Sequence, residues 1–378
     1  MAVVTKYFDP TTGAGAADGS SWANRAPLIV AGAWGSVLTG FDFSGSDSLI
    51  ALVGPGSCTP TAALSSGSFT RAPTAANQCY LQGCDSSGNA LTPPDADWTS
   101  DQPAYTYSGF PEIGTTSNIA TLNCDYVNSR CINFTATGRT SGAMIIESAA
   151  GRVDLSWCRI ANSASNTSAG GASVSKVANC LVEMGTTFSY GVTTLGGGHV
   201  SNTRLTAGGS GGSGNRDGIV YGGTTSAAIY ERCLIKGFAG SGVTSSSSNA
   251  GQNFSVISAT IVSCGNGIKM AATGSQTANH KVSRCFITGC TVGLDAQSAA
   301  RFNLGTTRLR NTTDLSNTGN NPITIGVVTT AGSDAEYVDA TGGDYRMARS
   351  SAYWGGGYGV SDQASGGAVP TGFSGGFQ

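Results

Sequence analysis

The sequence predicts an all-β fold, a single-stranded right-handed parallel β-helix in which the chain winds through stacked coils. Three observations carry this prediction. They are a glycine-rich composition with few charges, apolar residues that alternate with a period of two, and an internal repeat of about 22 residues. We expect the column to have an irregular N-terminal cap and a Gly-rich C-terminal tail.

Composition excludes most other classes of protein. Charged residues make up 11% of the 378 residues, far below the roughly 25% of ordinary soluble domains, while glycine reaches 56. A hydrophobic fraction of 39% with a mean hydropathy of -0.01 is too apolar for a generic disordered chain. The class that remains is an all-β protein with many turns and a surface of hydroxyl and amide groups.

The repeat is clearest when the chain is aligned on seven anchor positions, spaced 22 to 30 residues apart: Cys158, Cys180, Thr203, Cys233, Thr260, Cys285 and Thr307. An aliphatic residue stands two positions after each anchor: Ile160, Val182, Leu205, Ile235, Val262, Ile287 and Leu309. An apolar residue stands three positions before each anchor: Leu155, Val177, Val200, Tyr230, Ile257, Val282 and Leu304. Side chains two residues apart on a strand point the same way, so each anchor and its following aliphatic residue are predicted to face the interior. Cys131 begins a weaker eighth coil, with its aliphatic position displaced to Ile132 and Phe134.

The odd offset of three requires a bend between two short strands. Asn179 and Asn202 directly precede their anchors, and Asn tolerates the left-handed conformation that such a bend needs. A further strand is predicted after a glycine in five coils, at Gly191, Gly218, Gly242, Gly267 and Gly293. The longest spacings mark loop insertions, at 207–218 and 244–252.

This pattern divides the chain into three segments. Residues 1–110 are expected to form the N-terminal cap and irregular first coils, and residues 111–330 the parallel β-helix. Residues 331–378 form a closing segment and a Gly/aromatic tail.

Charge and hydropathy limit the partners. A net charge of -2 and a pI near 5.7 offer nothing that attracts phosphate backbones, so we expect no nucleic-acid partner. No run of 18 apolar residues exists that would span a membrane. The N-terminus lacks the basic and apolar regions of a signal peptide.

Both ends of the chain resemble one family. Tyr7-Phe-Asp-Pro10 followed by Asp18-Gly-Ser-Ser-Trp22 is similar to the opening of pectate-lyase-like right-handed β-helix proteins, many of them from bacteriophages. Asp344-Tyr-Arg-Met347 resembles the way those chains close. The resemblance covers most of the chain but concerns architecture, because this fold hosts lyases, hydrolases, adhesins and inert virion parts. The chain departs from long tailspikes in showing no separate head-binding domain before the opening motif.

The sequence assigns no catalytic residue. Glycoside hydrolysis needs two carboxylates about 5–9.5 Å apart. Of the seven acids within the repeat, no two share the same offset from their anchors, so no stack of acids is predicted. Should the chain be an enzyme, the candidates are Asp217, Glu231 and Asp295. A lyase would also need a basic residue near acids, and Lys236 and Lys269 qualify by residue type.

No metal and no cofactor is predicted. Cys79 and Cys84, and likewise Cys285 and Cys290, are separated by four residues, whereas zinc sites favour shorter spacings and four ligands. The anchor cysteines are more simply small buried hydrophobes of an interior ladder. We expect Cys158, Cys180, Cys233 and Cys285 to be reduced and shielded from solvent.

These observations favour a non-enzymatic virion surface protein of a bacteriophage: a capsid decoration, a head fibre, or a tail-associated structural or adhesion component. It would be made in the host cytoplasm and bind other capsid or tail proteins. Its attachment residues would be the aromatic residues of the tail: Tyr353, Trp354, Tyr358, Phe373 and Phe377. Self-association into homotrimers is the competing use of this tail. The alternative is a tailspike-type protein that binds or depolymerises a cell-surface glycan, as a glycoside hydrolase or lyase.

Overall fold

The computed structural model describes residues 2–45, 47–92, 109–115, 120–148, 152–163, 168–208, 216–222, 227–245, 253–271, 279–297, 301–317, 324–325, 328–329, 337–339 and 344–347. Strands dominate these residues, and the helices among them are short: α1 (Ser36–Thr39) and the 3-10 turns η1 (Trp22–Asn24) and η2 (Ser66–Ser68). None of the described helices has the length and apolar character needed to cross a membrane. The prediction of an all-β chain with little helix is confirmed.

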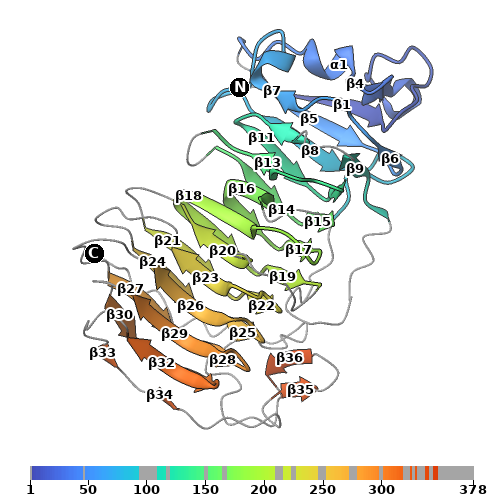
Figure 1. Cartoon of the computed structure of the whole chain (residues 1–378). Helices are drawn as coiled ribbons and strands as arrows, with labels where there is room; N and C mark the ends of the chain where they lie inside the picture. Colours follow the sequence, from blue (N-terminus) through green and yellow to red (C-terminus); the bar gives the residue numbers. More distant parts are fainter. Residues whose placement is uncertain are drawn as a thin grey trace.

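The strands stack into a column of parallel coils with three faces, and the coils follow one another from the N-terminal to the C-terminal end (Figure 1). In each regular coil the chain passes along the first face, turns a corner into the second face, and turns again into the third. Neighbouring strands within a face are hydrogen-bonded in parallel, one coil to the next. This arrangement is the predicted right-handed parallel β-helix.

The first face consists of β2 (Ala26–Pro27), β1 (Val3–Asp9), β5 (Ser48–Val53), β8 (Cys79–Gly83), β11 (Val127–Arg130), β14 (Asp154–Ser156), the C-terminal halves of β16 (Ala169–Ala178) and β18 (Tyr190–Ser201), β21 (Ala228–Glu231), β24 (Phe254–Ile257), β27 (Asn279–Ser283), β30 (Arg301–Leu304) and β33 (Thr324–Ile325). The second face consists of β6 (Ser57–Cys58), β9 (Glu112–Thr115), β12 (Asn133–Thr137), β15 (Arg159–Ser163), β17 (Leu181–Met184), β19 (Arg204–Ala207), β22 (Leu234–Lys236), β25 (Thr260–Val262), β28 (Phe286–Thr288), β31 (Thr307–Arg310) and β34 (Val328–Thr329).

The third face consists of β7 (Leu64–Ser65), β10 (Leu122–Asn123), β13 (Gly142–Ile146), the N-terminal halves of β16 and β18, β20 (Asp217–Tyr221), β23 (Ser241–Ser245), β26 (Asn266–Ala271), β29 (Val292–Gln297) and β32 (Thr313–Asn317). Two antiparallel hairpins complete the described strands: β3 (Ile29–Val30) with β4 (Ala33–Trp34), and β35 (Tyr337–Asp339) with β36 (Asp344–Met347). The long strands β16 and β18 run from the third face into the first without a break.

The anchor positions form an interior ladder, as predicted. The backbone N–H that follows an anchor donates to the carbonyl of the anchor in the previous coil, for example Leu181 N to Cys158 O at 3.0 Å and Arg204 N to Cys180 O at 3.0 Å. The anchors and the aliphatic residues two positions later are buried. All eleven cysteines are buried and none is in a disulfide, so the predicted shielding of the anchor cysteines is confirmed.

The alignment was wrong by one residue in two coils. Phe286 N donates to Ala259 O, and Ile261 pairs with both Ile235 and Ile287, so Ala259 is the anchor and Thr260 is not. Ile257 and Val262, which point outward here, are themselves apolar, so both alignments fit the same apolar pattern. In the eighth coil the anchor is Ile132, because Arg159 N donates to its carbonyl, and Cys131 is the bend residue before it.

The corner before each anchor is left-handed, as predicted for Asn179 and Asn202, whose φ angles are 53° and 45°. Seven successive coils have a residue with positive φ at this position: Cys131, Trp157, Asn179, Asn202, Arg232, Ser258 and Arg284. A non-glycine residue in this conformation is costly, so its recurrence shows that the stacked coils impose it.

The opening motif spans the end of β1 and the turns that follow it. Asp9 accepts hydrogen bonds from the backbone of Thr11 and Thr12 and forms an ion pair with Arg25 at 3.3 Å. The Arg25 guanidinium lies 4.8 Å from the ring centre of Trp22. The residues that carry the family resemblance at this end therefore stabilise the first turns of the chain.

Candidate functional site

Two of the three candidate acids lie on the third face but far apart along the column. Asp217 begins β20 and Asp295 lies within β29, and both residues are buried. β23 and β26 lie between these strands, so the two acids are three coils apart, or about 14 Å along the axis. This separation is larger than the spacing of a hydrolytic carboxylate pair.

Lys269 lies between these acids. It pairs in register with Asp295 in the next coil, and its positive charge acts on Asp217. Asp217 also accepts a 2.6 Å hydrogen bond from the backbone N–H of Ser241. Burial raises the pKa of the Asp217 carboxyl more than this hydrogen bond and Lys269 lower it. Asp217 is therefore a buried acid held by the next coil, with Lys269 two coils away along the same face.

The third acid lies on another face and has its own partners. Glu231 ends β21 on the first face, where its Oε1 atom lies 3.2 Å from Nε2 of His199 and 3.7 Å from the guanidinium of Arg232. The hydrogen bond with His199 holds the pKa of Glu231 below its usual value. Glu231 is therefore not grouped with Asp217 or Asp295, and its carboxylate is used in contacts between coils.

Polar side chains on the outer side of the first face are linked from coil to coil. Gln78 Oε1 accepts hydrogen bonds from Tyr80 at 2.9 Å and from Asn128 at 2.7 Å. In the following coils, Asn128 accepts from the backbone N–H of Asp154, and Asp154 forms an ion pair with Lys176 at 3.3 Å. Tyr80 is 40% exposed and Asn128 is 8% exposed, so the row is open at Tyr80 and buried where Asn128 links the coils.

The remaining candidates from the sequence are dispersed. Lys236 lies on the second face, between Thr206 and Val262 of the neighbouring coils, and is not beside the third-face acids. His280 is 2% exposed inside the column, with its ring centre 4.1 Å from that of Phe254. Burial lowers the pKa of His280 to about 3, so this imidazole is neutral and faces the core.

Glu147 has a role that sequence reasoning did not assign. It is 3% exposed and accepts hydrogen bonds from the backbone N–H groups of Arg152, Val153 and Ser175, and from the Ser175 hydroxyl at 2.5 Å. Burial raises the pKa of Glu147. Because these donors come from the turn after its strand and from the next coil, the carboxylate joins the two. In the sequence, Glu147 is marked only as an acidic residue at the end of an apolar strand, which does not predict this role.

Among the described residues, no three His, Cys, Asp or Glu side chains gather as a metal site would require. The proposed attachment residues of the tail all lie outside the described residues: Tyr353, Trp354, Tyr358, Phe373 and Phe377.

Comparisons with known proteins address the fold. No protein-family model and no curated protein matches the chain. Among solved structures, the crystal structure of pectate lyase Pel9A is similar, with a TM-score of 0.52 and 12% sequence identity, over 93% of this chain and 91% of that chain. The protein therefore has a pectate-lyase-like parallel β-helix fold. At this identity the likeness shows the fold alone, which hosts several functions.

Proposed function

We propose that this chain is a non-enzymatic surface component of a bacteriophage particle. The column acts as a spacer, and the C-terminal tail attaches it to a capsid or tail protein. The chain is made in the host cytoplasm and is carried on the virion surface.

The observation that carries this proposal is how the candidate acids are used. Asp217 is bonded to the backbone of the next coil, Asp295 accepts a 2.8 Å hydrogen bond from Gln297, and Glu231 is paired with His199. Asp217 and Asp295 are also three coils apart. Asp217 and Glu231 join neighbouring coils and Asp295 bonds within its own strand, so these carboxylates stabilise the column, and catalysis is not needed to explain them.

The resemblance of the chain ends to phage β-helix proteins supports the particle context. The test is the composition of purified particles of the phage that encodes the chain. We expect mass spectrometry to find the chain at a fixed copy number per particle, and labelled antibodies to place it on the outer surface. Its absence from purified particles would overturn the proposal.

The attachment role of the tail has a separate test. Deleting residues 361–378 should leave the circular dichroism spectrum of the column unchanged and abolish incorporation into particles. The matched control is the replacement of the same residues by a glycine-serine segment of equal length. If the truncated chain incorporates normally, attachment lies elsewhere.

The second candidate function is that of a polysaccharide-depolymerising protein. It is favoured by the position of Lys269, which pairs with Asp295 and acts on Asp217. A lysine beside acids is what lyase chemistry would use to remove a proton. A glycan bound along the polar row around Tyr80 would find hydrogen-bond partners and an aromatic ring there.

One activity assay separates the two functions. The purified chain is incubated with capsular and cell-wall polysaccharides of the host, and unsaturated products and new reducing ends are measured. The proposed function predicts no products. If products form, Lys269→Ala should abolish them and Lys236→Ala, on the second face, should not, which would establish the enzyme.

A further inference from the structure

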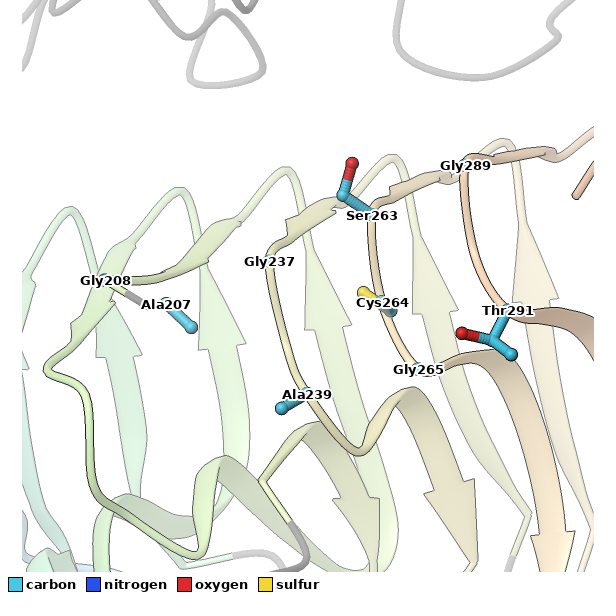
Figure 2. A pocket seen from close by; sticks show the side chains of 9 residues that line it. All are labelled: Ala207, Gly208, Gly237, Ala239, Ser263, Cys264, Gly265, Gly289 and Thr291. Carbon is cyan, nitrogen blue, oxygen red and sulfur yellow. The ribbon is translucent and has the colours of Figure 1, made fainter. Parts of the chain in front are cut away.

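A hollow of about 560 Å³ lies at the corner between the second and third faces, crossing four successive coils (Figure 2). Its lining consists of small residues: Ala207, Gly208, Gly237, Ala239, Ser263, Cys264, Gly265, Gly289 and Thr291. This volume is in the range of small-molecule sites. None of the described residues that line it is charged, so the hollow suits small uncharged molecules.

The hollow follows from the local backbone. Gly237, Ser263 and Gly289 occupy equivalent places in three coils and have positive φ angles of 79°, 52° and 64°. Each donates its N–H to the next coil, as in Ser263 N to Thr288 O at 3.0 Å. A row of left-handed residues with small side chains leaves the space open.

Cys264 forms part of the wall of this hollow, and Cys290 occupies the equivalent place in the next coil. Thr291 N donates to Cys264 O at 3.3 Å, which fixes this stacking. Cys264 is 4% exposed and Cys290 is 1% exposed. Each thiol donates to a backbone carbonyl two residues earlier, Cys264 Sγ to Val262 O at 3.4 Å and Cys290 Sγ to Thr288 O at 3.6 Å.

A second stacked pair, Cys158 and Cys180, offers an internal comparison. Cys180 Sγ lies 3.4 Å from the backbone N of Cys158, and both residues have no exposed surface. Neither residue lines the hollow. The two pairs therefore share their stacking and differ in whether a hollow leads to them.

We propose that Cys264 and Cys290 form a disulfide bond when a small hydroperoxide enters the hollow. One thiolate attacks the peroxide oxygen and becomes a sulfenic acid, and the peroxide leaves as water or an alcohol. The other thiol then attacks the sulfenic sulfur, the S–S bond forms, and water leaves. Overall, two thiols lose two hydrogen atoms and one hydroperoxide is reduced. The proposal does not depend on the function proposed above.

Geometry and product charge support this reaction. Stacked coils are about 4.8 Å apart, within the Cα separation of about 4.4–6.8 Å that disulfides adopt. The disulfide carries no charge, so the apolar interior can hold it.

The test is a timed oxidation of the native chain with hydrogen peroxide, followed by alkylation of remaining thiols and peptide mapping without reduction. We expect the Cys264–Cys290 disulfide to form at least about tenfold faster than any product at Cys158 or Cys180, because oxidation follows access. Equal rates for the two pairs, or a Cys264–Cys290 pair that stays reduced in the folded chain, would overturn the proposal.

Three variants sharpen the result. Cys290→Ser should block the disulfide and leave Cys264 available for trapping as a sulfenic acid, whereas Cys180→Ser should leave the Cys264–Cys290 reaction unchanged. Thr291→Phe narrows the hollow at an exposed residue and should slow the disulfide about tenfold. Oxidation of Thr291→Phe at the wild-type rate, with an unchanged circular dichroism spectrum, would show that the hollow is not the route.

Discussion

Two of the corners of each coil are turned by different means. At the corner between the first and second faces, one residue adopts a left-handed conformation, and its identity varies from Asn179 to Arg232 and Trp157. At the start of the third face the same position is occupied by glycine in six successive coils: Gly171, Gly191, Gly218, Gly242, Gly267 and Gly293. The first corner repeats a left-handed conformation in varied residues, whereas the start of the third face repeats the residue glycine itself, shortly after the left-handed row of Gly237, Ser263 and Gly289.

The difference lies in where a side chain would go. The Arg232 side chain at the first corner is 54% exposed, so size and charge are tolerated there. At the glycine corner a Cβ atom would lie 2.4–2.9 Å from a backbone oxygen of the next coil, for instance 2.8 Å from Gly267 O when built on Gly242. Many residue types can be held in a left-handed conformation at the first corner. At the glycine corner there is no space for a Cβ atom, so only glycine fits.

The largest expected effect comes from placing a charge just inside the first corner. Cys233→Asp should lower the free energy of unfolding by about 3–5 kcal/mol, because an unpaired carboxylate enters an apolar column. The matched control is Arg232→Asp, one residue earlier, where the side chain points to solvent. It should change the free energy of unfolding by less than about 1 kcal/mol. Urea unfolding measures the free energy for both variants. Similar losses for the two variants would mean that the corner does not separate interior from solvent.

The glycine corner should be nearly as sensitive to a single methyl group. Gly242→Ala should cost about 2–4 kcal/mol, since the methyl carbon would meet both Gly267 O and a methyl group of Ile261. Gly45→Ala is the control, because a Cβ there meets nothing within 4 Å. Thermal unfolding of both variants tests this, and a stable Gly242→Ala chain would refute the volume argument.

Acid should weaken the interior behind the first face. The pKa of His280 is about 3 in the folded chain and near 6.5 when unfolded, so the unfolded chain binds the extra proton between these values. Stability from this group is complete above pH 6.5 and falls with decreasing pH, by about 2 kcal/mol at pH 5. His280→Gln keeps an acceptor for Phe254 N and should remove this part of the pH dependence. If the free energy of unfolding falls with decreasing pH equally in the variant and the wild type, buried His280 is not the group responsible.

The smallest expected effect is a gain at the first corner. Arg232→Asn should raise the free energy of unfolding by up to about 1 kcal/mol, because Asn adopts positive φ at lower cost than Arg. Arg232→Val is the opposing control and should lower it, since a branched side chain resists this conformation. If both variants are equally stable, conformational strain does not limit this corner.

Much of the fold could be predicted because the interior repeats at fixed offsets. The anchors and their aliphatic neighbours located the coils from Cys158 onward, and Asn179 and Asn202 identified the left-handed corner. The alignment failed at Thr260 because Ile257 and Val262 are apolar on the outer side of the sheet, where the sequence pattern alone cannot distinguish inside from outside.

The candidate site was less accessible to sequence reasoning. The acids could be named, but their partners come from neighbouring coils: His199 for Glu231, and Ser241 and Lys269 for Asp217. These partners are 24 to 52 residues away in the chain, and their approach depends on the register of every strand between them. The hollow beside Cys264 had a signal, since aligned coils place Gly237, Ser263 and Gly289 together, but small residues are common throughout this sequence.

The direction of the ladder hydrogen bonds determines how the column responds to force. Bonds such as Leu181 N to Cys158 O join one coil to the next, so they run along the column axis. A pull on the two ends of the chain loads these bonds in tension and peels the outermost coil first, while the coils beneath stay closed. Single-molecule extension should therefore show successive steps, each releasing one coil of about 22 residues, or roughly 75 Å of extended chain.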